Sequence, residues 1–166
     1  MSPFPFTTAL VTGASSGIGA KMAEQLGRAG VPTVLVARRG EKLREIAGQF
    51  DGFSGLEADL GTAAGQDAVM EAVGNVENPV DLVVNNAGFG TSGQFAEVDA
   101  NRLSDEVELT VKALTRISSA AARAMAARGS GYLLNVSSVA SFQPAPGLAV
   151  YAATKAYVTS LTEALH

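Results

Sequence analysis

Two residues near the carboxyl end of the sequence have the types and the spacing of an acid–base pair, Tyr151 and Lys155. Residues four apart share one face of a helix, so the phenol and the ammonium are expected side by side. A free phenol has a pKa of about 10 and is a poor acid at neutral pH, but a nearby ammonium favours the phenolate. The pair suits proton donation to a carbonyl that is being reduced. A surface Tyr and Lys on an amphipathic helix is the alternative.

Ser138 lies thirteen residues before Tyr151, where an apolar strand pattern ends. A hydroxyl in that place can donate a hydrogen bond to a substrate oxygen and steady the charge that develops on it. The alternative is a strand-end serine that satisfies backbone groups in a turn. Ser137 precedes it in the sequence. We expect Ser138 to act with the tyrosine and the lysine.

A glycine-rich segment, Thr12–Gly19, follows the first apolar strand pattern and leads into a helical one. Gly13, Gly17 and Gly19 give it the spacing Gly-x-x-x-Gly-x-Gly, a variant of the dinucleotide-binding turn. Such a turn lets the backbone approach a pyrophosphate, and the helix presents free N–H groups to the phosphates. An ordinary strand–helix turn is the alternative, because such patterns also match by chance.

Two arginines, Arg38 and Arg39, follow the second strand pattern. An acidic residue about 20 positions beyond the glycine turn would bind the ribose 2′-hydroxyl of NAD. No acid stands at this strand end, and Glu41 is the first one after it. Guanidinium groups suit a 2′-phosphate through their charge and their forked hydrogen bonds. We therefore expect NADP(H) in preference to NAD(H), the alternative being a solvated basic helix start.

Strands and helices must alternate to position these residues. Predicted strands cover 7–12, 33–36, 53–58, 80–84 and 132–136, and predicted helices cover 17–29, 41–50, 63–76, 103–128 and 149–166. Short apolar strands between amphipathic helices predict a parallel sheet covered on both faces. The expected fold is a single α/β domain with a Rossmann-like, doubly wound sheet in three layers and a ligand crevice at the carboxyl ends of the strands. In the first helix, Ile18 is predicted to face inward with Met22 and Leu26.

Composition narrows the functional classes. The 166 residues are 47% hydrophobic and 17% charged, which predicts one globular domain. The net charge of −4 implies no general affinity for nucleic acid. There is no cysteine, and the only histidine is the terminal His166, so no metal site is expected. Neither a leader over residues 1–5 nor a membrane span is visible, which favours the cytoplasm.

Together, the motifs from Thr12 to Lys155 resemble the short-chain dehydrogenase/reductase family, of the size class called classical. The resemblance implies an NADP(H)-dependent oxidoreductase that moves hydride between the nicotinamide and a carbonyl or alcohol. In that family, Tyr151 would be the general acid/base, Lys155 would assist it and hold the nicotinamide ribose, and Ser138 would orient the substrate oxygen. The family's fourth catalytic residue is an asparagine, and the apolar pattern places Thr110 there. Threonine keeps the backbone carbonyl but lacks the amide, which puts the family's water relay in question.

The resemblance also assigns the remaining cofactor contacts. These are main-chain contacts of Ser15, Ser16 and Ile18 at the phosphates and the nicotinamide, Asp59 and Leu60 at the adenine, and Asn86, Ala87 and Gly88 along the adenosine. Strand-end turns are the alternative for the last two groups, because Asp, Asn and Gly dominate turns. The family continues past the end of this sequence with two more strands and a substrate loop, so its C-terminal part is expected to be missing here.

The sequence also supports general expectations for the substrate and for the oligomeric state. The loop over residues 139–150 is mostly apolar, which predicts a small carbonyl or alcohol substrate of apolar character. The alanine-rich run over 120–127 permits close helix packing, and the family pairs this helix and the next to form dimers and tetramers. A homodimer or homotetramer is therefore expected. The alternative function is a non-catalytic dinucleotide-binding protein that senses cofactor or acts as a scaffold.

Overall fold

Five parallel strands form one sheet in the order β3-β2-β1-β4-β5. They are β1 (Ala9–Thr12), β2 (Thr33–Ala37), β3 (Phe53–Glu57), β4 (Leu82–Asn85) and β5 (Tyr132–Asn135). This computed structural model describes residues 4–166, and residues 1–3, on which part of the leader prediction rests, lie outside it. The chain steps outward from β1 on both sides, so the predicted doubly wound parallel sheet is confirmed.

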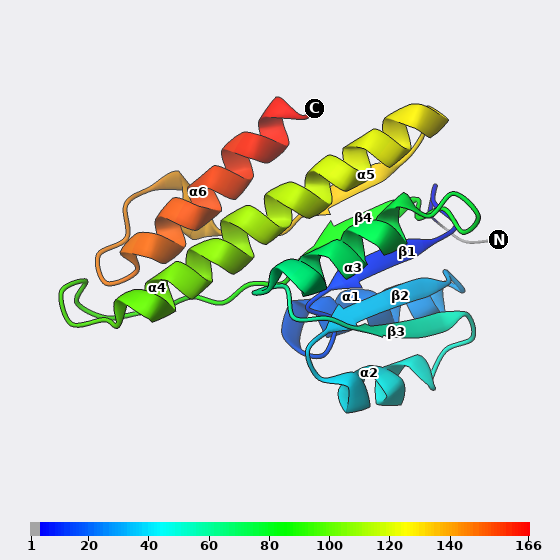
Figure 1. Ribbon diagram of the computed structural model, residues 1–166, viewed down its shortest axis with the longest axis horizontal. Coiled ribbons are helices and arrows are strands. Elements are labelled where there is room, and N and C mark those ends of the chain that lie inside the picture. The colour runs from blue at the N-terminus through cyan, green and yellow to red at the C-terminus, as the bar shows by residue number, and fades with distance from the viewer. Residues whose placement is uncertain (1–3) are drawn as a thin grey trace.

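Helices cover both faces of this sheet (Figure 1). They are α1 (Gly17–Arg28), α2 (Gly40–Ala47), α3 (Ala63–Gly74), α4 (Ala100–Val107), α5 (Leu114–Arg128) and α6 (Ala149–Ala164), with a π-helical stretch η1 (Glu108–Ala113) and a 3₁₀ turn η2 (Val139–Phe142). One core cluster joins the sheet to α1 and α2, and the other joins it to α3 and α5.

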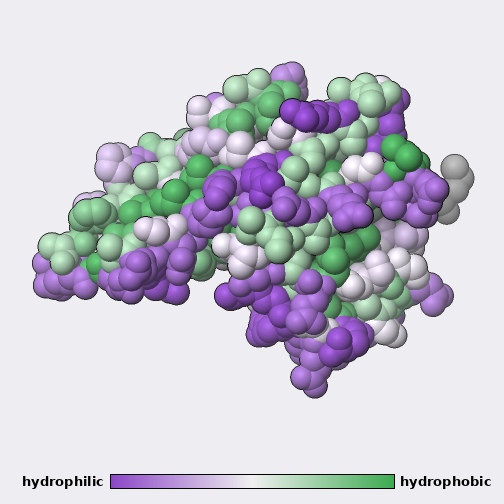
Figure 2. Space-filling view, in the orientation of Figure 1, coloured by the Kyte–Doolittle hydropathy of each residue, from purple (hydrophilic) through white to green (hydrophobic). Residues whose placement is uncertain are grey.

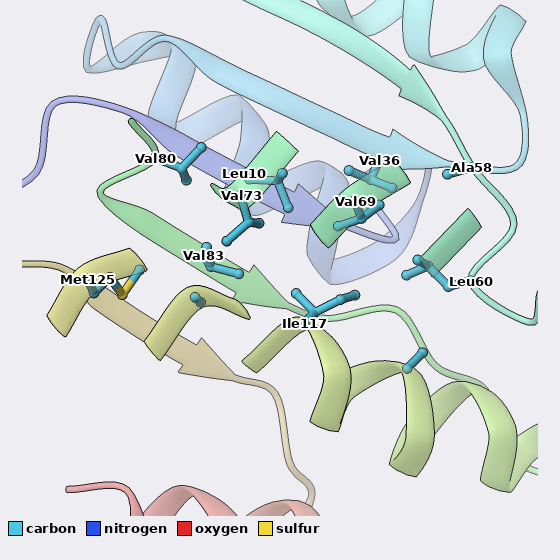
Figure 3. Packing of buried hydrophobic residues seen from close by; sticks show 12 residues of the cluster. Leu10, Val36, Ala58, Leu60, Val69, Val73, Val80, Val83, Ile117 and Met125 are labelled. Carbon is cyan, nitrogen blue, oxygen red and sulfur yellow. The ribbon is translucent and has the colours of Figure 1, made fainter. Parts of the chain in front are cut away.

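Alternate residues of the central strands supply these two clusters. Leu10 and Val83 face α3 and α5, where Val69 and Ile117 meet them (Figure 3). Their neighbours in the strands belong to the opposite cluster. Burying a Val, Leu or Ile side chain stabilises a fold by about 1.5–3 kcal/mol, so the two clusters fix the sheet and the positions of its strand ends.

The structure differs from the single long helix predicted over 103–128 in where the helix starts and in the form of its interior. It begins earlier, at Ala100, where the Asp99 side chain accepts a hydrogen bond of 3.0 Å from the Asn101 backbone N–H. It then passes through η1, whose wider turns change which residues face the sheet. It ends, as the glycine suggests, at Gly129 in the left-handed region with φ of 70°. Figure 1 shows α4, η1 and α5 as one continuous arm beside α6.

One prediction of a core residue is wrong. Ile18, expected on the inward face of the first helix, is 61% exposed, whereas Leu26 further along is buried. The first turn of α1 follows the glycine turn directly, and in it Gly17 and Ile18 are exposed whereas Gly19 is buried. The apolar side chain of Ile18 therefore faces solvent instead of the core.

None of the helices in the part of the chain that the structure describes is both long and apolar enough to span a lipid bilayer. Hydrophilic side chains gather over α2, at the bottom of Figure 2, while hydrophobic ones gather where α4 and α6 run side by side.

Candidate active site

The glycine turn brings the end of β1 and the start of α1 close together. Gly13 is left-handed with φ of 66°, and a Cβ there would stand 2.9 Å from the backbone of Ala87. A Cβ on Gly19 would stand 2.5 Å from the Gly13 carbonyl oxygen, so neither position admits a side chain. Ser16 precedes α1, and no side chain caps the helix. The first N–H groups of α1 are therefore available to an anion.

The segment after β4 is tied to this turn by hydrogen bonds. The Thr12 hydroxyl accepts from the backbone N–H groups of Asn86 and Ala87, at 2.9 and 3.0 Å, and donates to the Val84 carbonyl. The Asn86 amide donates to the Thr12 carbonyl at 3.0 Å. The structure thus places Asn86 and Ala87 beside the glycine turn, and their contact with the adenosine stays a prediction.

Both predicted arginines are exposed at the end of β2. Arg39 donates a hydrogen bond of 3.0 Å to the hydroxyl of Ser15, which lies in the glycine turn and is nearly buried. Arg39 therefore borders the turn. Glu57, at the end of β3, lies against Gly40, the residue after Arg39. This acidic neighbour comes from another strand, and reading the end of β2 alone could not reveal it.

Asp59 and Leu60 lie after β3, and their side chains differ in surroundings. The Asp59 carboxylate accepts from the Gly61 N–H at 2.9 Å, and its backbone carbonyl accepts from Thr62. Leu60 is 5% exposed and belongs to a core cluster (Figure 3). A ligand in the crevice would reach Asp59 and not the side chain of Leu60.

Tyr151 and Lys155 share one face of α6, as their spacing predicts. The Lys155 ammonium lies 5.9 Å from the centre of the Tyr151 ring and donates a hydrogen bond of 2.7 Å to the Val136 carbonyl. Lys155 is nearly buried, and this burial lowers its pKa below the ordinary value, while the Glu106 carboxylate acts in the opposite direction. The Tyr151 ring packs against Gly90, where a Cβ would stand 2.9 Å from the ring.

The two serines after β5 have different partners. Ser137 donates to the Lys155 backbone carbonyl at 3.0 Å and bonds the Thr159 hydroxyl, so it fastens α6 to the strand end. The Ser138 oxygen accepts from the Ala140 N–H at 3.2 Å at the start of η2, which packs on α6. Its own hydroxyl proton has no acceptor among the hydrogen bonds of the described residues and can serve a substrate oxygen.

Thr110 lies in η1 with its hydroxyl buried and unpaired among the described residues. A Cβ on Gly88 would stand 3.5 Å from this hydroxyl and 3.9 Å from the Lys155 nitrogen, so the two groups flank one glycine. Sequence reasoning missed Glu106, which is fully buried one turn earlier. The available signal was a carboxylate four residues before Thr110, on the same face of a helix.

A pocket of about 240 Å³ has Val150, the residue before Tyr151, in its lining, and most of that lining is apolar. Its walls come from the loop after β4, from α4 and from the start of α6: Thr91, Gly93, Gln94, Phe95, Val98, Leu103, Gly147, Ala149 and Val150. Sequence reasoning included the last three in its apolar loop, but not the wall from residues 91–103, because nothing in the pattern places that loop opposite α6.

Comparison with known proteins identifies the class that this fold and site define. The family model described as short chain dehydrogenase matches residues 7–166. The chain belongs to the short-chain dehydrogenase/reductase family, whose members are oxidoreductases acting on CH–OH groups. A curated relative, gluconate 5-dehydrogenase of Gluconobacter oxydans, is 37% identical over 162 residues, which cover 95% of this chain and 63% of the relative.

Solved structures agree with this assignment. A ketone-specific alcohol dehydrogenase from Comamonas testosteroni, described as bulky-bulky ketone specific, superposes with a TM-score of 0.91 and 35% identity, covering 98% of this chain and 67% of its own. A short-chain dehydrogenase from Sphingobium yanoikuyae in complex with NADPH gives a TM-score of 0.90 and 37% identity, covering 95% and 64%. The chain thus spans about two thirds of the length of the relatives it matches.

Proposed function

We propose that this protein is an NADP(H)-dependent oxidoreductase that interconverts a ketone or aldehyde and its alcohol. The observation that carries the proposal is the Tyr151–Lys155 pair: a nearly buried ammonium 5.9 Å from the phenol ring, beside an apolar pocket at the carboxyl edge of the sheet. A phenol next to a fixed ammonium is suited to proton transfer near neutral pH.

The residues present fit a dinucleotide. The uncapped start of α1 and the side-chain-free approach at Gly13 and Gly19 suit the pyrophosphate, and Arg38 and Arg39 suit a 2′-phosphate. When bound, NADPH supplies the hydride. This chain's own groups then do the rest: Tyr151 gives its proton to the carbonyl oxygen, Lys155 holds a positive charge beside the phenol, and the Ser138 hydroxyl donates to the same oxygen.

The pocket favours a substrate with apolar substituents on its carbonyl. Phe95, Val98, Leu103 and Val150 line it, and no charged residue does. The Comamonas structure, described as bulky-bulky ketone specific, supports an apolar ketone, whereas gluconate 5-dehydrogenase has a polar sugar acid in its name. We assign the apolar ketone to this chain because the pocket offers no cation for a carboxylate.

A second candidate is a dinucleotide-binding protein without turnover. The observation that favours it is Thr110, whose buried hydroxyl stands where the family has an asparagine amide. For either function we propose a cytoplasmic homodimer or homotetramer. Close packing of α5 against a second copy would use its alanine-rich surface. The catalytic and the non-catalytic hypotheses differ in whether Tyr151 is needed for turnover.

The cofactor assignment predicts that Arg39→Ser weakens the binding of NADPH but not the binding of NADH. Removing the guanidinium should raise the Kd for NADPH at least about tenfold, because a charge-assisted pair with a phosphate is worth about 1.5–3 kcal/mol. The Kd for NADH should stay within about twofold, since NADH lacks the 2′-phosphate. Fluorescence of the reduced nicotinamide reports both, and the sequence has no tryptophan to interfere.

Arg28→Ser is the matched control for this measurement. Arg28 lies at the other end of α1 and pairs with Glu24, far from the end of β2. It should leave both affinities unchanged. If the Arg39→Ser and Arg38→Ser variants bound NADPH like the wild type, or if the wild type preferred NADH, the NADP(H) assignment would be wrong.

A further inference from the structure

Glu106 is a fully buried carboxylate that the proposed reaction does not yet use. It lies in α4 with no exposed surface, and neither oxygen has a hydrogen-bond partner among the described residues. A carboxylate out of water is strongly disfavoured unless an opposite charge or hydrogen-bond donors compensate it. Its surroundings must therefore supply a cation or a donor.

The nearest element with a buried cation is α6, which packs against both α4 and η1. Lys155 on α6 is 7% exposed, and among the described residues its ammonium donates one hydrogen bond, to the Val136 carbonyl. An ammonium has three N–H donors, so two remain. Burial lowers the pKa of Lys155, and among the described residues Glu106 is the charged group that raises it.

The other groups around Lys155 are neutral or weakly acidic. The loop after β4 contributes Gly88 without a side chain, and η1 contributes the Thr110 hydroxyl. From β5 comes the Val136 carbonyl, and from α6 itself the Tyr151 phenol. Among the charged groups of the described residues, Glu106 on the packed helix α4 is therefore the one that acts on this lysine with the opposite sign.

We propose that Glu106 is a positioning residue for Lys155: its buried carboxylate is the counter-charge that holds the lysine as an ammonium ion beside Tyr151. The catalytic consequence rests on the proposed function, in which the Lys155 charge acts on the phenol. Thr110, one turn after Glu106, has its hydroxyl beside Gly88, as does the Lys155 nitrogen. Glu106 touches neither substrate nor cofactor in this account and acts through Lys155.

The test is an NMR titration of Lys155 in the full protein with lysine labelled at Cε, the signal being assigned by its loss in Lys155→Met. In Glu106→Gln the titration should move to lower pH by at least about one unit, because removing a buried opposite charge that acts on an ammonium group lowers the pKa of that group. Glu106→Asp keeps the charge and should restore most of the wild-type value. Asp105→Asn, an exposed neighbour on the same helix, should leave the titration unchanged.

A double-mutant cycle of thermal stability provides a second test of the pairing between Glu106 and Lys155. Glu106→Gln should lower the Tm of the wild type, because it leaves the buried ammonium uncompensated, and should raise the Tm of Lys155→Met, because it removes a lone buried carboxylate. An unchanged Lys155 titration in Glu106→Gln, or equal Tm changes in both backgrounds, would overturn the pairing.

Turnover is measured separately. In Glu106→Gln, kcat for carbonyl reduction should fall at least about tenfold at pH values above the lowered Lys155 pKa and recover below it. The titration and the Tm cycle need no substrate, so they decide the pairing even if the wild type reduces no carbonyl, a result that would overturn the proposed function alone.

Discussion

Replacing Tyr151 by phenylalanine is expected to lower kcat for carbonyl reduction by about 10²–10⁴-fold, the usual contribution of a general acid. The substitution removes only the phenolic hydroxyl and keeps the ring that packs on Gly90. NADPH binding should therefore stay within about twofold of the wild type, because the glycine turn and the arginines are untouched. Steady-state kinetics with an apolar ketone and a fluorescence titration with NADPH measure the two quantities.

Tyr157 offers a matched control for this variant. It lies on the same helix, and its hydroxyl bonds the Thr115 hydroxyl at 2.7 Å, outside the pocket. Tyr157→Phe should change kcat by no more than about twofold, since surface substitutions away from a site have small effects. Undiminished reduction by Tyr151→Phe would remove the acid–base role from this residue.

Gly19→Ala is expected to have the largest effect on cofactor binding. The new Cβ would meet the Gly13 carbonyl oxygen at 2.5 Å and would also collide with the side-chain amide of Asn86. The start of α1 would have to move away from β1, and its N–H groups would move with it. We expect the Kd for NADPH to rise at least about tenfold and the free energy of unfolding to fall by about 1–3 kcal/mol, as for other overpacked sites.

Gly74→Ala is the control for the added methyl group. Gly74 is the last residue of α3, and a Cβ there meets nothing within 4 Å. Alanine should leave NADPH affinity unchanged and alter the free energy of unfolding by at most about 1 kcal/mol, in the stabilising direction. Denaturant unfolding and nicotinamide fluorescence measure both variants. Wild-type NADPH affinity in Gly19→Ala would contradict phosphate binding at this turn.

The sheet was predictable because its three central strands, β1, β2 and β4, are buried on both faces. Apolar runs such as 33–36 alternate with helical periods, and right-handed crossovers then leave few ways to order the strands. The same rules place the segments after β1, β2, β4 and β5 at one edge, where the structure has them. The bounds differ by a few residues, chiefly at helix ends, where fraying and caps decide the limits.

Side-chain partners at the site were not predictable to the same degree. Periodicity places Glu106 on a helix, but its burial depends on α6 packing against α4, a contact between distant parts of the chain. The π-helical stretch η1 shifts the helical phase around Thr110, and no residue type marks it. The prediction that Ile18 faces the core is wrong because an apolar helical pattern does not show where along the helix the cover of the sheet begins.

Transfer of deuterium from NADPH, labelled with two deuterium atoms at the nicotinamide C4, to a ketone tests the central claim most directly. The protein is incubated with a set of ketones from bulky diaryl ketones to sugar acids, and each alcohol product is examined by mass spectrometry. We predict one deuterium on the carbinol carbon of an apolar alcohol with the wild type, and about 10²–10⁴-fold slower formation of that labelled alcohol with Tyr151→Phe. Saturable NADPH binding without deuterium in any product would contradict the reductase and favour the non-catalytic dinucleotide-binding protein.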